Sequence, residues 1–193
     1  MSVVVSIDFD YFVRDIDFDY NRFSESDMDR FADFPPKDIG RILREKGLDL
    51  DQRTEIARAS EHNKGYNFLK DKVIKLLVNF DAHLDVSDYD DYGNFPAEFV
   101  SEGNWLRFLN PEIIYMVYPK RCKRELNFQE EFPELNARIM TVDDLPRFDL
   151  HVDYLFVCRS AYWMPYSKHL DEFFQEMLSV LLEECGKKIF NEF

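Results

Sequence analysis

Residues 73–85 read VIKLLVNFDAHLD, an apolar run followed at once by three side chains that can ligate a metal ion. The apolar run predicts a buried strand over about residues 74–80. Asp81, His83 and Asp85 would share one face if the chain stayed extended, and a looser loop could also bring them to one cation. Two carboxylates and one imidazole suit Mn²⁺ or Mg²⁺, and less often Zn²⁺ or Fe²⁺. The stretch therefore predicts a metal site at the carboxyl end of a strand.

A second acidic pair follows the first apolar run of the chain. Residues 2–8 read SVVVSID and predict another buried strand, which ends in Asp8 and is followed closely by Asp10. Two strands would thus each deliver carboxylates from their carboxyl ends. Residues 17–20 repeat the Asp-Phe-Asp-Tyr pattern of residues 8–11, but no β-branched run precedes them, so we interpret this second copy as loop.

The remaining pattern predicts alternating strands and helices. We expect strands at 112–118, 138–142 and 154–158, and helices at 37–46, 52–60, 95–109 and 170–184. Such alternation is typical of an α/β fold with a mainly parallel sheet covered by helices, in which ligand sites lie at the carboxyl ends of the strands. The length of the chain predicts a single domain, residues 1–193.

The charge of the chain narrows the classes of partner. The formal net charge is −14 at pH 7, which argues against binding to a nucleic-acid backbone and favours cationic partners. Hydrophobic residues make up 46% of the chain, so a mainly disordered chain is excluded. A compact protein with a cationic substrate fits this composition.

The sequence predicts a cytoplasmic protein with no membrane function. No window reaches the roughly 18 apolar residues of a membrane-spanning helix, and no basic-then-apolar leader opens the chain. Cys122, Cys158 and Cys185 are odd in number and widely spaced, which favours a reducing compartment. Cys158 follows an apolar run and is interpreted as a buried core thiol rather than a nucleophile.

One further histidine is a candidate ligand. His62 stands in a polar stretch 19 residues before Asp81. It is the natural second imidazole for a site built around His83. We interpret His151 and His169 as surface residues.

The motif of residues 81–85, the Asp8-Phe9-Asp10 pair and the upstream His62 resemble the binuclear manganese centre of the ureohydrolases, the arginase and agmatinase superfamily. A small arginase-like group that includes peptide arginases is more similar still. Those enzymes convert arginine side chains in ribosomally made precursor peptides to ornithine and urea. The stretches that carry this closer resemblance are 61–62, 79–85, 113–119 and 159–160.

The resemblance implies a three-layer arginase/deacetylase-like fold, two Mn²⁺ ions per chain and an arginine-containing precursor peptide as partner. Two ions that share a water would lower its pKa and generate a metal-bridging hydroxide, which attacks the guanidinium carbon. Asp85 and His83 are the implied catalytic residues, because a carboxylate such as Asp85 can help move a proton to the leaving amine. The implied metal ligands are Asp8, Asp10, His62, Asp81, His83 and Asp85, and the candidate substrate-binding residues are Glu102, Asn104 and Ser160.

Three departures from the family pattern stand out. The Asp-x-Asp pair precedes the acidic-His-acidic motif, whereas in familiar ureohydrolases it follows, as if the chain were permuted. Ser60-Glu61-His62 replaces the Gly-Gly-Asp-His setting of the first ligand in larger arginases. Between Asp85 and His151 the chain has no histidine that could shuttle protons.

The acidic aromatic segment 15–34 is our candidate for engaging a basic or leader-bearing peptide, and a homo-oligomer is left open.

Other hypotheses stay open. A ureohydrolase could act on a free guanidino compound, and a deacetylase on the arginase-like fold would also use an Asp-x-His motif. Residues 5–10 also resemble the opening strand of haloacid dehalogenase-type phosphatases, with Asp143 and Asp144 as the downstream Mg²⁺ pair; against this, Tyr11 and Phe12 stand where small or hydroxyl residues are expected. An acidic binding module without enzymatic activity would explain the composition without any metal.

Overall fold

Six strands build one parallel sheet in the part of the chain that this computed structural model describes, residues 2–13, 33–86, 98–120, 135–161, 164 and 168–187. Their bounds are β1 Ser2–Asp8, β3 Glu55–Ala59, β4 Ile74–Phe80, β5 Ile113–Tyr118, β6 Ala137–Thr141 and β8 Tyr154–Cys158. The strand order is β3-β8-β1-β4-β5-β6, and every neighbouring pair is parallel. A second, small sheet pairs β2 (Leu48–Asp49) with β7 (Leu150–His151).

The side chains of the central strands alternate between two hydrophobic clusters. On β1, Val5 packs into the cluster on one face of the sheet, whereas Val4 packs into the cluster on the other face. On β4, Val78 and Leu77 divide in the same way. A parallel sheet that is covered on both faces requires such continuous apolar runs, and this is why both strands were recognisable in the sequence.

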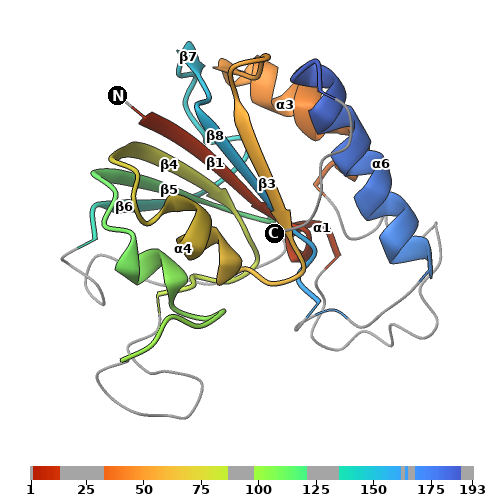
Figure 1. The fold of residues 1–193 in the computed structure, drawn as a ribbon. Coiled ribbons are helices and arrows are strands. Elements are labelled where there is room, and N and C mark those ends of the chain that lie inside the picture. Colours follow the sequence, from red (N-terminus) through yellow and green to blue (C-terminus); the bar gives the residue numbers. More distant parts are fainter. Residues whose placement is uncertain are drawn as a thin grey trace.

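Helices cover both faces of the sheet and give three layers (Figure 1). On one face lie α3 (Ile39–Glu45) and α6 (Lys168–Glu184), and on the other lie α4 (Lys64–Leu69) and the 3₁₀ helix η3 (Trp105–Phe108). Two shorter elements are α1 (Asp10–Val13), directly after β1, and the 3₁₀ helix η2 (Pro36–Asp38), directly before α3. The predicted α/β class, with a mainly parallel sheet in three layers, is confirmed.

Most of the predicted elements match the structure to within one or two residues at each end. The strands expected at 2–8, 74–80 and 154–158 have the predicted bounds. The helix expected at 170–184 is α6, whose buried side chains are Leu170, Phe174, Met177, Leu178, Leu181 and Leu182. Its apolar stripe packs into the same cluster as Val5, so it is a packing helix, as the spacing predicted.

The helix expected at 52–60 was wrong, because this segment forms β3. Its alanine and arginine residues favour helix when considered alone. In the structure, however, β3 pairs with β8 along its whole length, from Glu55 opposite Tyr154 to Ala59 opposite Cys158. The pairing with a neighbouring strand thus overrides the local preference.

The helix expected at 95–109 was also wrong over the described part of that range, where the helical residues are those of η3. The side chain of Asn104 closes the preceding loop. Its Oδ1 accepts a hydrogen bond from the Ser101 N–H at 2.7 Å, and its Nδ2 donates to the Phe99 carbonyl at 3.1 Å. Such local side-chain bonds offer the backbone an alternative to a helix. Residues 95–97 lie outside the described part of the chain.

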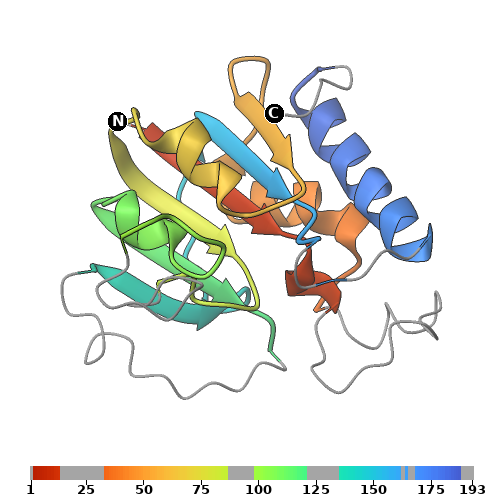
Figure 2. The same cartoon turned by 60° about the horizontal axis from the view of Figure 1, so that its bottom comes forward.

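The carboxyl ends of the central strands meet at one edge of the sheet, where α1 also lies (Figure 2). In the sheet order, β1 stands between β8 and β4. After β1 the chain continues to β3, at one edge of the sheet. After β4 it continues to β5, toward the opposite edge. Open α/β sheets bind ligands where successive connections diverge in this way.

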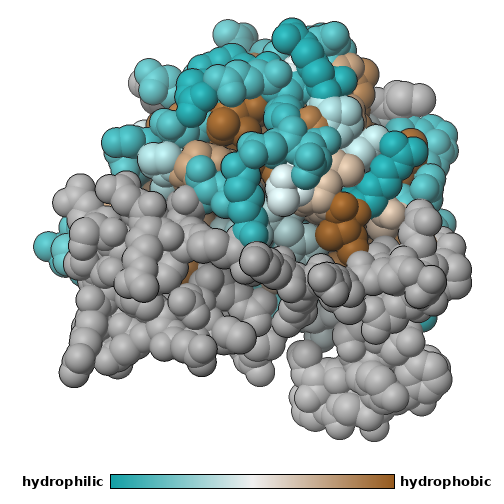
Figure 3. All heavy atoms as spheres, turned by 180° about the vertical axis from the view of Figure 1, so that it is seen from behind, coloured by the Kyte–Doolittle hydropathy of each residue, from teal (hydrophilic) through white to brown (hydrophobic). Residues whose placement is uncertain are grey.

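Among the coloured residues, the surface seen from behind is mainly hydrophilic, with hydrophobic residues in small groups between the polar ones (Figure 3). Val73 and Phe99 are exposed large hydrophobic side chains. None of the helices in the described ranges is both long enough and apolar enough to cross a membrane.

Candidate metal centre

Asp8 and Asp10 lie at the carboxyl end of β1, where the chain turns into α1. Alternation along the strand places Ser6 and Asp8 on the same face as Val4. The Asp10 N–H donates to Asp8 Oδ1 at 3.1 Å, and the Ala82 N–H donates to Asp10 Oδ1 at 3.2 Å. Both carboxylates are buried. The two acidic motifs, distant in the sequence, therefore meet directly.

Residues 81–86 leave β4 as a loop rather than as a continued strand. The His83 N–H turns back to donate to Asp81 Oδ1 at 2.7 Å. Asp85 has a φ of 54°, in the left-handed region, which further bends the segment. The side chains at positions 81, 83 and 85 converge through this curled loop, the second of the two arrangements that their spacing allowed.

His62 follows β3 and lies in the middle of the acidic cluster. Its Nδ1 lies 2.7 Å from Asp85 Oδ2, 3.0 Å from Asp8 Oδ2 and 3.3 Å from Asp81 Oδ2. A single ring N–H cannot satisfy three carboxylates at once. Three carboxylate oxygens and one ring nitrogen therefore lie close together, and a bound cation would compensate the negative charge of the carboxylates.

Two groups of buried ligands share one carboxylate. Asp8, His62 and Asp81 form the first trio, and Asp10, Asp81 and His83 form the second. Within each trio the ligand atoms all lie within 4.8 Å of one another, so these groups could hold metal ions. Asp81 belongs to both trios, which fits two ions in neighbouring positions.

Burial makes two carboxylates of the cluster, those of Asp8 and Asp85, harder to ionise. Burial, together with the charge of Asp10, raises the pKa of Asp8 to about 6. Burial, together with the charge of Asp81, raises the pKa of Asp85 to about 8. For Asp81, burial acts in the same direction, but hydrogen bonds with His62 and His83 outweigh it and hold its pKa below the usual range.

The two histidines carry the compensating charge when no metal is bound. Burial alone would lower the pKa of His83, but hydrogen bonds with Asp10 and Asp81 outweigh it and raise the pKa to about 10. The pKa of His62 is likewise raised well above its usual value, because the charges of Asp8 and Asp85 outweigh burial. The protons on these two rings neutralise carboxylate charge that a metal ion would otherwise neutralise. Metal binding would therefore displace these protons.

Three polar residues that sequence reasoning missed support this cluster. Ser6 Oγ lies 3.1 Å from Nε2 of His62, and Asn79 Nδ2 donates to Asp81 Oδ2 at 3.2 Å. The indole N–H of Trp105 donates to Asp85 Oδ2 at 2.5 Å. Ser6 and Asn79 had a visible signal, since each is a polar residue inside an apolar strand. Trp105 had none, because its partner lies on a distant loop.

The candidate substrate residues differ in their relation to the cluster. Glu102 is next to it: Oε2 accepts the His62 backbone N–H at 3.2 Å, and burial raises the pKa of Glu102 to about 6. Asn104 instead closes its own loop, as described above. Ser160 is buried just after β8, with a φ of 58°, and its N–H donates to Cys158 Sγ at 3.2 Å.

The other sequence candidates lie away from the cluster or outside the described residues. His151 pairs with Asp51 and His169 with Glu172, both at 3.5 Å. Cys158 is buried and burial raises the pKa of its thiol, as expected for a core cysteine rather than a nucleophile. Residues 15–32, including the second Asp-Phe-Asp-Tyr copy, and Cys122 are outside the described ranges.

Asp143 and Asp144 do not join the cluster that a phosphatase would need. Both are exposed; Asp143 pairs with Lys120 at 2.6 Å, and Asp144 accepts a hydrogen bond from Thr141 at 2.8 Å. The observed partners of Asp8 and Asp10 come instead from the segment after β4 and from His62.

Comparison of the chain with protein-family models, with curated proteins and with solved structures found no match in any of the three. The fold and the site therefore define the class by themselves: an α/β protein with a buried Asp/His cluster that could hold metal ions at the carboxyl edge of its sheet.

Proposed function

We propose that this protein is a binuclear metal-dependent hydrolase of the ureohydrolase type, acting on arginine side chains in a peptide with two Mn²⁺ ions. The observation that carries the proposal is the position of Asp81 in both ligand trios. A carboxylate shared between two sites supports a pair of neighbouring ions that act on one water. When bound, the ions supply Lewis acidity and a nucleophilic water at neutral pH.

The charge around the cluster suits a guanidinium substrate. Carboxylates outnumber imidazoles among the buried groups, and the whole chain carries a net charge of −14. Glu102 adds a carboxylate beside His62 that belongs to neither trio. A planar cation can pair with such a carboxylate through two parallel hydrogen bonds. We therefore assign Glu102 to substrate binding.

The reaction adds water across the bond between Cζ and Nε of the arginine side chain. Cζ keeps its two terminal nitrogens and leaves with the water oxygen as urea, and the Nε atom becomes the ornithine amine after it gains a proton. We assign the transfer of that proton to Asp85, and the contacts of its carboxylate with His62 and Trp105 support this role. Burial of the surrounding carboxylates keeps bulk water away from the proton being moved.

The choice of peptidyl arginine rests on the resemblance of residues 61–62, 79–85, 113–119 and 159–160 to the small peptide arginases. We place the enzyme in the cytoplasm, because Cys158 and Cys185 are free thiols.

Mass spectrometry of a reacted peptide tests the proposal. Purified protein loaded with Mn²⁺ is incubated with an arginine-containing peptide, and in parallel with free arginine and with agmatine. The peptide is expected to lose about 42 Da, the mass of CH₂N₂, with release of urea. The matched control is Asp81→Asn, which should be inactive. Loss from the free compounds alone would establish a small-molecule ureohydrolase, and no reaction by metal-loaded protein would contradict the ureohydrolase assignment.

A further inference from the structure

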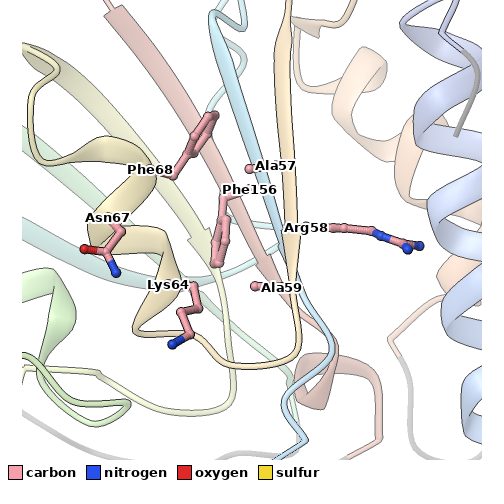
Figure 4. Close-up of a pocket in the computed structure, with 7 residues that line it drawn as sticks. All are labelled: Ala57, Arg58, Ala59, Lys64, Asn67, Phe68 and Phe156. Atoms are coloured by element: carbon pink, nitrogen blue, oxygen red, sulfur yellow. The ribbon is translucent and has the colours of Figure 1, made fainter. Parts of the chain in front are cut away.

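A pocket of about 280 Å³ lies between the edge strand β3 and helix α4 (Figure 4). It exists because β3 presents only Ala57 and Ala59 toward α4, whereas β1 and β4 present Val4 and Leu77 on the same face. The short alanine side chains leave space that α4 does not fill. The residues that line the pocket are Ala57, Arg58, Ala59, Lys64, Asn67, Phe68 and Phe156.

The walls of the pocket are apolar and aromatic. The rings of Phe68 and Phe156 have centroids 6.5 Å apart and planes inclined by 30°. Figure 4 shows both rings beside the two alanines, whereas the Arg58 guanidinium and the Asn67 amide point away. Aromatic rings contact flat apolar groups favourably. A volume near 280 Å³ suits a ligand with one ring.

Lys64 also lines the pocket, and in Figure 4 its ammonium lies beyond the Phe156 ring, on the side away from Phe68. Its Nζ lies 3.6 Å from Glu61 Oε2, and both side chains are nearly half exposed. An ion pair of this kind contributes little to stability, so an incoming anion can replace Glu61 as the partner of Lys64. The pocket thus combines apolar walls with one exchangeable positive charge.

Phe156 separates this pocket from the metal centre. Its ring is stacked on His62 at 5.8 Å with an interplanar angle of 9°, and it also lines the pocket. No member of either ligand trio lines the pocket. We propose that the pocket is a second binding site, for a small aromatic carboxylate, with the ring against Phe68 and Phe156 and the carboxylate at Lys64.

Isothermal titration calorimetry with phenylacetate tests this proposal on the full chain. The expected result is saturable binding with a Kd below about 1 mM, and binding of 2-phenylethylamine that is roughly tenfold weaker because its charge is reversed. Ala57→Leu fills the pocket and should abolish binding. Lys64→Gln should weaken phenylacetate binding about fivefold and remove the preference over the amine.

Two controls keep the outcome clear. Lys64 is exposed, so Lys64→Gln tests the site even if Ala57→Leu does not fold, which circular dichroism would reveal. Asp81→Asn disrupts the proposed metal centre but should leave phenylacetate binding unchanged. Absence of saturation, equal binding of the amine, unchanged binding in Lys64→Gln, or loss of binding in Asp81→Asn would each overturn the proposal, whatever the enzymatic assay gives.

Discussion

Asp81 and His62 approach each other with Oδ2 of the carboxylate 3.3 Å from Nδ1 of the ring, although they belong to segments that follow different strands. The other oxygen of Asp81, Oδ1, lies 3.6 Å from Nδ1 of His83. One carboxylate therefore stands between two imidazoles, with a different oxygen toward each. This arrangement underlies the assignment of two neighbouring cation positions.

The shared position of Asp81 predicts unequal effects of two single substitutions. Asp81→Asn should remove both ions, because it weakens both trios, whereas Asp10→Asn should remove about one ion and leave the other. Metal analysis after dialysis against Mn²⁺ and gel filtration measures this directly. Both variants should lose hydrolysis. Retained turnover in metal-depleted Asp81→Asn would refute the mechanism, and equal metal loss in the two variants would refute the shared-ligand arrangement.

Trp105 should report metal binding through its hydrogen bond to Asp85. Mn²⁺ bound beside Asp85 is expected to quench the fluorescence of this buried indole. Asp85 belongs to neither ligand trio, and we propose it as an additional ligand. Trp105→Phe removes the N–H donor and keeps most of the ring, so it should weaken Mn²⁺ binding roughly 10- to 100-fold, as loss of an outer hydrogen bond to a ligand usually does. The sequence contains one other tryptophan, Trp163, so Trp163→Phe is the matched control. Quenching that disappears in the control and persists in Trp105→Phe would contradict this role.

The metal-free protein should lose stability as pH rises. Asp8 and Asp85 keep protons up to pKa values of about 6 and about 8, whereas their usual value is 3.8, and His83 keeps its proton up to about 10. The folded chain thus binds more protons than the unfolded chain in this window, so the free energy of unfolding falls with rising pH. Excess Mn²⁺ should flatten or reverse the slope, because the metal replaces these protons.

Urea denaturation at about pH 5.5 and about pH 8.5, with EDTA or with Mn²⁺, measures this dependence. Asp85→Asn is the control, because it removes one of the proton-binding groups and should reduce the slope in EDTA. A midpoint that rises with pH in EDTA would show that the cluster is not protonated in the folded chain.

Gly65 permits α4 to approach the two rings that pack on His62. A Cβ at this position would lie 2.9 Å from Phe156 Cε1 and 3.1 Å from Trp105 Cζ3. Gly65→Ala should therefore destabilise the protein by about 1–3 kcal/mol through overpacking, despite the better helix propensity of alanine. Gly103→Ala is the matched control, because its Cβ meets nothing within 4 Å and should change stability by less than about 0.5 kcal/mol. Equal stability of the two variants, measured by urea denaturation, would contradict this packing.

Strands with a continuous apolar run could be predicted from the sequence. An element whose conformation depends on pairing with a distant strand could not. The strands of residues 2–8 and 74–80 are buried on both faces, so their apolar runs were sufficient. The edge strand β3 has Ala57 and Ala59 in place of large β-branched residues, and its extended form depends on pairing with β8. No periodicity within residues 52–60 could have revealed that pairing.

The residues of the candidate site also fall into those that the sequence reveals and those that depend on the tertiary structure. The acidic motifs at 8–10 and 81–85 were visible because carboxylates at strand ends stand out, and the structure brings them together with His62. The Trp105 bond to Asp85 depends on how residues 98–109 fold, and that segment was predicted incorrectly. The placement of Asn104 as a loop-closing residue has the same origin.

Electron paramagnetic resonance of the Mn²⁺-loaded protein detects directly whether two neighbouring ions share Asp81. With a matched metal analysis, we expect about two Mn²⁺ per chain and the spectrum of a magnetically coupled pair, because the ions would lie roughly 4 Å apart. Asp81→Asn should abolish that spectrum. A single isolated Mn²⁺, two uncoupled ions, or no bound metal would contradict the two-metal centre.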